Sequence, residues 1–218
     1  MGKLPKQPKT KLDLEEVISC LGKVTMTLRE NPQKALEDLR KIGSAIDSQV
    51  PYRDGHSIRV TDHCMAISEY LGFDYNEKVV LEVAALLHDF GKIGIDETIL
   101  MKPKKLTKEE KLEIDMHVMR GYYMLAGFNE LIEALRGIKS HHEYYDGTGY
   151  PEGLTKTEIP LMGRIIAVAD AFDAMTSKRP YRKALNKEEA IQELKNGVGK
   201  QFDPAIVKIF IKYINERK

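Results

Sequence analysis

The sequence contains little cysteine and almost no net charge. Only two cysteines, Cys20 and Cys64, occur in 218 residues, and they do not form a CxxC pair. Two thiols in a chain of this length do not indicate a disulfide framework, so we expect a reducing, cytoplasmic setting. The formal net charge is +1, whereas proteins that bind nucleic-acid polymers usually present a basic face. We therefore expect no nucleic-acid polymer as a partner.

Long hydrophobic runs are also absent. The most apolar segment, Val79–Leu87, is short and contains Glu82, whereas a helix needs about 20 apolar residues to cross a bilayer. Residues 1–12 hold four lysines and no apolar stretch, so they do not form a secretory signal. We expect residues 1–12 to be a disordered basic tail, and we expect no membrane partner.

The sequence lacks the period-two alternation of apolar and polar residues that indicates a strand. Capping residues instead precede apolar stripes at Asp13, Asn31, Asn76, Thr107, Asn129 and Asn186. The segments expected to be helical are 14–28, 32–46, 56–71, 77–89, 107–126, 130–143, 161–176, 187–196 and 204–215. Residues 93–105 and 144–160 are expected to be loops. The predicted fold class is all-α, with eight to ten helices.

The stretch Leu86–Gly94, LLHDFGKIG, places His88 and Asp89 side by side at the end of an apolar run. Buried charged groups are costly unless they are paired or bind a metal, so this pair is half of a candidate metal site. The full set of candidate ligands lies on five segments: His56, His88, Asp89, His117, His141, His142 and Asp170.

This ligand set combines imidazoles and carboxylates without thiolates, which suits Mn, Fe, Ni, Co or Zn. Seven ligands exceed the roughly three or four that one such ion takes from a protein, so we expect two ions bridged by Asp89. Two ions about 3.5–4 Å apart can share a water and clamp a phosphoryl group, which predicts hydrolysis of a phosphate ester. Ordinary surface or core histidines are the open alternative, and His63 is expected to be structural.

Two longer motifs make the pattern specific. HDFGK (His88–Lys92) resembles the HD motif of metal-dependent phosphohydrolases, and HHEYYDGTGYP (His141–Pro151) resembles the HHExxDGxGYP signature of the HD-GYP subfamily. The resemblance extends from about Ile46 to about Ile211. It implies an HD-domain helical bundle with an HD-GYP loop and additional C-terminal helices.

The resemblance also implies a function, a metal-dependent phosphodiesterase (hydrolase) of bacterial signalling. Such an enzyme hydrolyses cyclic di-GMP to pGpG and often on to GMP, at two or three transition-metal ions among which iron and manganese are prominent. One ion would be held by His56, His88, Asp89 and Asp170, and the other by Asp89, His117, His141 and His142. A hydroxide that bridges the ions would be the nucleophile.

The same motifs imply how substrate is held. Lys92 would contact a phosphate oxygen and offset the charge that develops in the transition state, which makes Lys92 and Asp89 the expected catalytic residues. The expected substrate contacts are Asp146, Gly149, Tyr150, Arg179 and Lys183. Gly149 would let the backbone approach a ligand closely, and Asp146 would bond a histidine or the substrate. Arg179 and Lys183 could instead form ion pairs with Asp173.

Some features depart from the family pattern. Val50 and Arg53 stand where many members have aspartate and threonine, and a third-metal ligand cannot be placed, with Glu15, Glu16 and Asp47 as candidates. The helices of residues 13–45 are expected to pack on the core or on a partner subunit, which would allow a homodimer, and residues 46–218 are expected to form the catalytic domain.

HD-GYP domains are often fused to sensory or receiver domains. None fits in residues 1–45, so we expect a free-standing enzyme or an excised domain. Two other functions remain open: a general HD nucleotide phosphohydrolase, and a regulatory module that binds a cyclic dinucleotide without cleaving it. The presence of all seven candidate ligands favours an enzyme over such a module.

Overall fold

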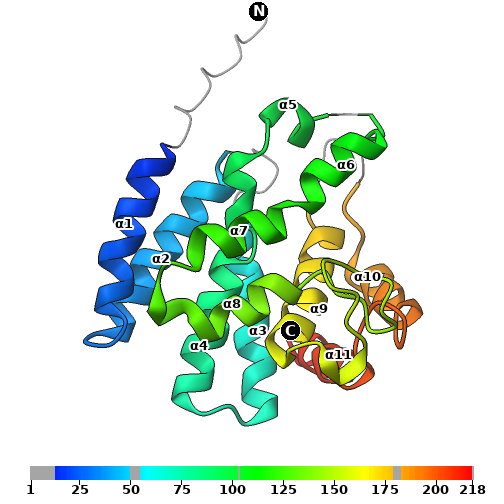
Figure 1. Cartoon of the computed structure of the whole chain (residues 1–218). Helices are drawn as coiled ribbons and strands as arrows, with labels where there is room; N and C mark the ends of the chain where they lie inside the picture. Colours follow the sequence, from blue (N-terminus) through cyan, green and yellow to red (C-terminus); the bar gives the residue numbers. More distant parts are fainter. Residues whose placement is uncertain (1–12, 50–54, 103, 179–182, 218) are drawn as a thin grey trace, which may run out of the picture.

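The computed structural model describes residues 13–49, 55–102, 104–178 and 183–217, and within these ranges it contains helices and no strand (Figure 1). The α-helices are α1 Leu14–Thr27, α2 Pro32–Asp47, α3 His56–Leu71, α4 Tyr75–Leu87, α5 Glu97–Leu100, α6 Lys108–Asp115, α7 His117–Leu125, α8 Ile132–Ser140, α9 Leu161–Thr176, α10 Lys187–Asn196 and α11 Pro204–Glu216. The described residues also form three short 3₁₀ helices, η2 Phe90–Gly94, η3 Asn129–Leu131 and η4 Lys156–Glu158. The predicted all-α class is confirmed.

Most of the predicted helix starts are confirmed by their caps. The side chains of Asp13, Asn31 and Asn186 accept hydrogen bonds from backbone N–H groups in the first turns of α1, α2 and α10. Thr107 and Glu110 form the predicted capping box of α6. These side chains satisfy N–H groups that have no partner within the helix.

Two predicted helix starts are wrong, each for its own reason. Helix α4 begins at Tyr75, and its cap is Asp74, which forms a capping box with Glu77. Helix α8 begins at Ile132, because the chain after Asn129 first forms the 3₁₀ helix η3.

The structure also divides segments that were expected to be continuous. The expected helix 107–126 is two helices, α6 and α7, separated at Met116, and the expected loop 93–105 contains the last residues of η2 and all of α5. The described residues therefore hold eleven α-helices rather than eight to ten.

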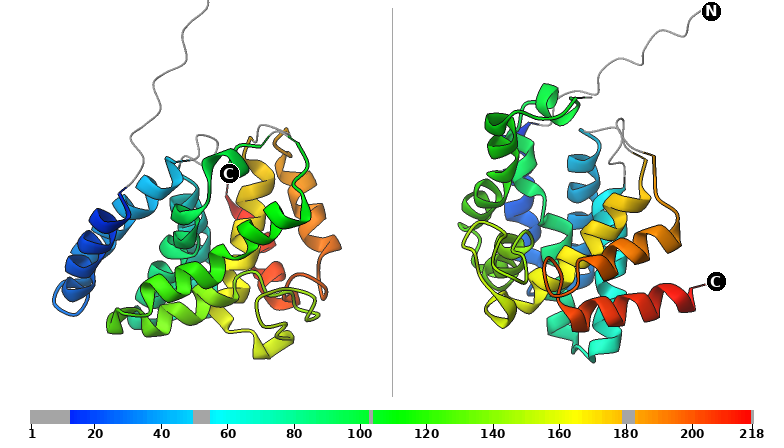
Figure 2. Two further views of the ribbon diagram at one scale, coloured as in Figure 1. Left: turned by 45° about the horizontal axis from the view of Figure 1, so that its top comes forward. Right: turned by 90° about the vertical axis from the view of Figure 1, so that its right-hand side faces the viewer.

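One core cluster extends from α1 to α11, although α5 and α6 contribute no buried residue to it. Leu21 of α1 and Leu39 of α2 belong to the same buried cluster as Leu87 of α4, Ile138 of α8 and Phe210 of α11. Helices α3, α4, α8 and α9 pack on one another at the centre, with α1 and α2 on one side and α10 and α11 on the other (Figures 1 and 2). No helix among the described residues is both long and apolar enough to span a membrane.

Candidate metal centre

Helix ends supply most of the predicted ligands. His56 is the first residue of α3 and His117 the first of α7, while His88 and His141 directly follow the last turns of α4 and α8. Asp89 precedes η2. Since several helices end at the same place in the core, their terminal side chains converge there.

Three of these histidines are held by the same local hydrogen bond. In each, Nδ1 lies 2.7 Å from the carbonyl oxygen three residues earlier: His88 with Ala85, His117 with Ile114 and His141 with Ile138. A carbonyl in the last turn of a helix lacks a helical N–H partner, and the imidazole N–H supplies one. Nδ1 therefore carries the proton, and the lone pair of Nε2 is free to bind a metal.

The first group of potential ligands consists of His56, His88 and Asp170, whose ligand atoms all lie within 4.8 Å of one another. His56 Nε2 is 3.3 Å from His88 Nε2 and 3.3 Å from Asp170 Oδ1. Both imidazoles are buried, and Asp170 is mostly so. Asp170 comes from the middle of α9, where it faces the ends of α3 and α4.

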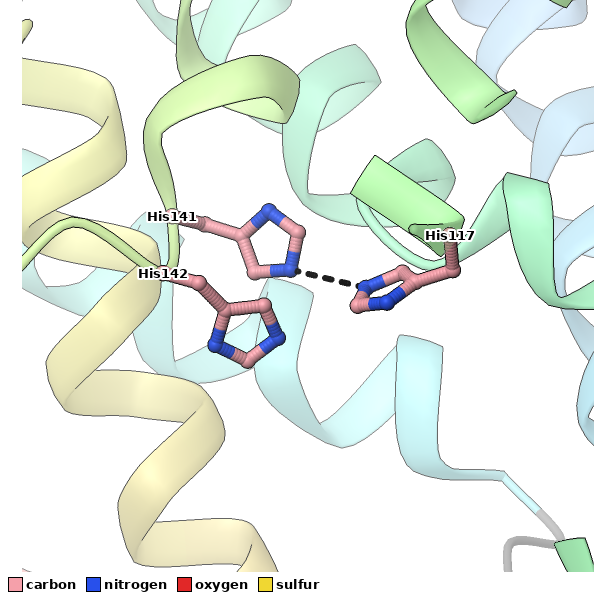
Figure 3. A group of neighbouring side chains, drawn as sticks. All are labelled: His117, His141 and His142. Atoms are coloured by element: carbon pink, nitrogen blue, oxygen red, sulfur yellow. Dashed lines mark hydrogen bonds between the residues drawn. The ribbon is translucent and has the colours of Figure 1, made fainter. Parts of the chain in front are cut away.

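The second group consists of His117, His141 and His142, and its ligand atoms also lie within 4.8 Å of one another. Figure 3 shows the three rings turned toward one another, with His141 and His142 on neighbouring residues and His117 opposite them. His117 Nε2 and His141 Nε2 are 3.4 Å apart. These residues bring the end of α8 against the start of α7.

Asp89 lies between the two groups and faces each with a different oxygen. Its Oδ2 is 3.5 Å from His56 Nε2 and 3.4 Å from His88 Nε2, whereas its Oδ1 is 3.2 Å from His117 Nε2. The Nζ of Lys92 lies 2.6 Å from the same Oδ1. All seven predicted ligands are therefore brought together, with Asp89 between the two groups. Its role as a bridge between ions stays a prediction.

The donor set fits metal ions on chemical grounds. His88, His117 and His141 each hold a proton on Nδ1, so in the neutral rings the Nε2 atoms of His117 and His141 meet as two acceptors at 3.4 Å. Two lone pairs at this distance repel one another unless a cation or a proton lies between them. Imidazoles and carboxylates without thiolates suit the borderline and hard transition metals.

Burial and neighbouring charges set the protonation of these histidines. Burial and the neighbouring histidines hold the pKa values of His141 and His142 well below the usual value, and burial and Lys92 lower the pKa of His117. Burial also disfavours the charged form of His88, but Asp89, Asp170 and the carbonyl of Ala85 together outweigh burial and raise the pKa of that ring. The second group is thus neutral imidazole, the form in which histidine binds a metal.

Asp173 and Arg59 support the first group, and the sequence reasoning gave neither of them this role. Asp173 Oδ2 is 2.7 Å from His56 Nδ1, and Arg59 Nε donates to Asp173 Oδ1 at 2.5 Å. Although burial alone would raise the pKa of Asp173, hydrogen bonds from His56 and Arg59 hold it well below the usual value. Helical spacing could have revealed the pair. Arg59 lies three positions after His56, and Asp173 lies three positions after Asp170.

Contacts within the predicted GYP loop fix part of its shape. A Cβ added to Gly149 would lie 2.2 Å from Tyr144 N and 2.5 Å from His142 O, so the glycine permits a close approach of the loop to its own backbone. Asp146 Oδ1 accepts hydrogen bonds from the backbone N–H and hydroxyl of Thr148 rather than from a histidine. The ring of Tyr150 stacks on His142, with centroids 5.0 Å apart.

Glu143 is a further residue that sequence reasoning did not single out. Its buried carboxylate accepts hydrogen bonds from the backbone N–H groups of Glu152 and Leu154, at 2.7 and 3.1 Å. It therefore fixes the loop to the end of α8, next to His142. Its place in the HHE motif was the available signal.

The remaining predicted residues are only partly covered. Arg179 lies outside the described residues, and Lys183 is exposed after α9. Asp173 forms its ion pair with Arg59. In the described part of the chain, the suggested ion pair between Asp173 and Lys183 is therefore not seen. Their role toward substrate stays a prediction.

The candidate ligands for a third ion do not belong to the two groups described above. Asp47 is buried, and its carboxylate accepts hydrogen bonds from the backbone N–H and hydroxyl of Ser57, which anchors the start of α3. Glu15 and Glu16 are exposed on α1. Among the described residues, neither metal-ligand group includes any of these three acids.

A family model described as an HD domain matches residues 41–206. The chain belongs to this HD domain family. The predicted resemblance is therefore confirmed at the level of the family, and the histidines and aspartates described above lie within the matched range.

Curated relatives of this HD domain are phosphodiesterases of cyclic dinucleotides. A cyclic di-GMP phosphodiesterase response regulator of Xanthomonas campestris is 38% identical over 88% of this chain and 52% of the relative. A cyclic di-GMP phosphodiesterase of Thermotoga maritima is 41% identical over 76% of this chain and 46% of the relative. A 3'3'-cGAMP-specific phosphodiesterase of Vibrio cholerae is 36% identical over 79% of this chain and 38% of the relative. The chain thus spans about half the length of these relatives, or less.

Solved structures show the same fold. A cyclic GMP-AMP specific phosphodiesterase of V. cholerae has a TM-score of 0.64 at 23% identity, covering 84% of this chain and 49% of that one. An HDG"Y"P protein from Bdellovibrio bacteriovorus has a TM-score of 0.64 at 19% identity, and the match covers 91% of this chain and 70% of that one. The expected HD-domain helical bundle is therefore confirmed as the fold of this chain.

Proposed function

We propose that this HD domain is a metal-dependent phosphodiesterase that hydrolyses cyclic di-GMP to pGpG and further to GMP. The observation that carries the proposal is the carboxylate of Asp89, which faces histidines of both ligand groups at 3.2–3.5 Å. The relatives named as cyclic di-GMP and cGAMP phosphodiesterases support the substrate class.

The proposed metals are two ions of iron or manganese, one in each ligand group. When bound, such a pair supplies an activated water as nucleophile and stabilises the charge on the phosphoryl group. The chain contributes the order of the site: hydrogen bonds at Nδ1 orient the rings of His88, His117 and His141 before any ion binds. Less reorganisation is then needed at the moment of reaction.

Lys92 is the proposed electrostatic partner of the substrate. Its ammonium is mostly buried, lies on η2 and contacts Asp89 Oδ1 at 2.6 Å. From there it can donate a hydrogen bond to a phosphate oxygen bound beside Asp89. A buried ammonium favours a phosphoryl group whose negative charge grows in the transition state.

The direct test is turnover of cyclic di-GMP by protein purified without oxygen and loaded with Fe(II) or Mn(II). We expect pGpG to form first and GMP to follow, as measured by chromatography. Intact cyclic di-GMP together with hydrolysis of a simple nucleotide would instead indicate a general nucleotide phosphohydrolase. Tight binding measured by calorimetry without product would indicate a regulatory module.

Other parts of the proposal concern the whole protein. We propose a cytoplasmic setting and a homodimer through the outer faces of α1 and α2; Leu14 and Met26 are exposed on α1. Because the matched relatives are about twice as long as the aligned region or longer, a sensory or receiver domain in the same signalling system also stays a prediction. Sedimentation analysis of the full chain would test the dimer.

A further inference from the structure

A cavity of about 250 Å³ opens beside the candidate metal centre. One side of it is formed by His141, His142 and Asp170, so a group bound there lies next to both ligand groups. Sites for drug-sized ligands enclose roughly 300–1,000 Å³. The cavity is therefore suited to one part of a dinucleotide, such as a single base.

The walls of this cavity suit a flat ring. Ala167 and Ala171 line it from α9, one helical turn apart, and their short side chains leave a smooth apolar surface. Tyr144 also lines the cavity and adds an aromatic group. A nucleobase could lie in such a space, because its faces are apolar and its hydrogen-bonding groups are confined to its edges.

The polar end of the cavity is formed by Lys111 and Asp115 of α6. These residues lie one turn apart, and Lys111 Nζ contacts Asp115 Oδ2 at 2.5 Å. Lys111 is largely exposed, so its ammonium can move toward a ligand, whereas the Asp115 side chain is about three-quarters buried.

Two other carboxylates line the cavity, but the structure already assigns them contacts. Glu143 accepts hydrogen bonds from two backbone N–H groups of the loop, and Asp170 belongs to the first metal-ligand group. Asp115 has about four lone-pair positions on its two oxygens, of which Lys111 takes one and the hydroxyl of Tyr150, another lining residue, takes a second. Among the described residues, Asp115 is therefore the lining carboxylate best placed to accept hydrogen bonds from a ligand.

We infer that Lys111 and Asp115 form a guanine subsite that selects the base next to the metal centre. This inference rests on the proposed function and names the part of the substrate that the cavity holds. A guanine edge presents the acceptors N7 and O6 and, beside them, the donors N1–H and N2–H. Lysine donates to the first pair, and a carboxylate accepts from the second. Adenine keeps the N7 acceptor but places a donor at N6 and an acceptor at N1. It therefore loses one of the two lysine contacts and opposes the carboxylate.

The test compares cyclic di-GMP with cyclic di-AMP in the metal-loaded enzyme. Asp115→Asn replaces one acceptor oxygen with a donor, so the ratio of kcat/KM for cyclic di-GMP to that for cyclic di-AMP should fall about 10- to 100-fold. The kcat/KM for cyclic di-GMP relative to that for bis(p-nitrophenyl) phosphate, which has no base, should fall by a similar factor. Lys111→Met should lower both ratios in the same direction.

Asp38→Asn is the matched control, because Lys34 and Asp38 form the same (i, i+4) ion pair on α2, away from the cavity. It should leave both ratios unchanged. An Asp115→Asn enzyme whose ratios equal those of the control would overturn the guanine subsite. Equal losses on all three substrates would overturn it too, since they would show an effect on the metal centre or the fold.

A binding measurement separates this inference from the proposed activity. Calorimetry with GMP and AMP on the metal-loaded protein needs no turnover. If cyclic di-GMP is not cleaved, but GMP binds at least tenfold more tightly than AMP and Asp115→Asn removes the difference, the subsite stands and the proposed activity fails. Equal binding of GMP and AMP by the unaltered protein would overturn the subsite, whatever the activity.

Discussion

The Nδ1 hydrogen bonds explain how single residues become metal ligands. In His88, His117 and His141 the acceptor is a backbone carbonyl, which the chain supplies wherever a helix ends. In His56 the acceptor is the carboxylate of Asp173. A carboxylate binds an imidazole N–H more strongly and raises the basicity of the opposite nitrogen. The orientation and basicity of His56 therefore depend on the Asp173 side chain, which can be replaced without changing any of the seven predicted ligands.

Replacement of Asp173 by asparagine tests this dependence. Asp173→Asn keeps the shape but removes the charge that His56 and Arg59 share, so we expect about 10- to 100-fold weaker Mn(II) binding in the first group. Calorimetric titration measures it. Asp62→Asn, an exposed position on α3, the helix of His56 and Arg59, should bind Mn(II) like the unaltered protein. Equal affinities in both variants would contradict the role of Asp173.

Lys92 makes a different prediction, since it contacts Asp89 but is not a ligand. Lys92→Met should lower kcat about 10²- to 10³-fold, because the variant loses a charge directed at the phosphate, while metal content stays the same. Steady-state kinetics and elemental analysis of the same preparation measure the two quantities. Loss of metal in parallel with activity would show instead that Lys92 supports the ligands.

At the scale of elements, a close contact between η2 and α7 holds Asp89 against His117. A Cβ added to Gly91 would lie 2.0 Å from His117 O and 2.5 Å from Gly121 N. Backbone atoms cannot move aside as a flexible side chain can. The two glycines therefore set the distance between the two segments that meet at the bridging carboxylate.

Gly91→Ala should consequently destabilise the protein. Overpacking of this kind costs about 1–3 kcal/mol, and at this chain length each kcal/mol lowers Tm by about 2–4 °C. Thermal unfolding followed by circular dichroism measures the change. Gly127→Ala is the control, because nothing lies within 4 Å of a Cβ added there. A Tm for Gly91→Ala equal to that of the control would rule out the close contact.

The helix boundaries differ in how well the sequence predicts them. Caps such as Asp13 and Asn186 act within one turn, so local sequence determines them. The break at Met116 depends on tertiary structure, because His117 turns into the centre and bonds the carbonyl of Ile114. No capping signal marks that break, and the expected single helix was wrong for this reason.

At the scale of the whole molecule, the motifs predicted which residues converge, but not how they are supported. All seven predicted ligands meet at one centre, since the HD and GYP motifs carry their identity in short stretches. The backbone carbonyls that bond His88, His117 and His141 are local. The partner of His56, in contrast, comes from a distant segment, because Asp173 lies 117 positions away. Such contacts follow from packing and leave only a weak trace in local sequence.

Global stability should depend on pH through His63. This ring packs edge-on against Phe172, Phe210 and Tyr213, its Nδ1 has no hydrogen-bond partner among the described residues, and burial lowers its pKa from 6.5 to about 4. Between these values the unfolded chain binds a proton that the folded chain does not. Stability is therefore lost as pH falls from 6.5 to 4, by about 3 kcal/mol at most.

Urea unfolding at several pH values measures this loss. His63→Leu should remove this share of the pH dependence, because leucine stays neutral, so the difference in unfolding free energy between the two proteins should change between pH 7 and pH 4.5. Other titrating groups are common to both proteins and cancel in the difference. A difference that stays constant over this range would contradict the buried, neutral state of His63.

The metal content per chain tests most directly whether one carboxylate joins two ion sites. After purification without oxygen and saturation with Mn(II), we expect two ions per chain in the unaltered protein, measured by elemental analysis. His56→Gln should retain one ion, and Asp89→Asn, which alters both sites, should retain none tightly. A single ion in the saturated protein, or two ions in Asp89→Asn, would contradict the account.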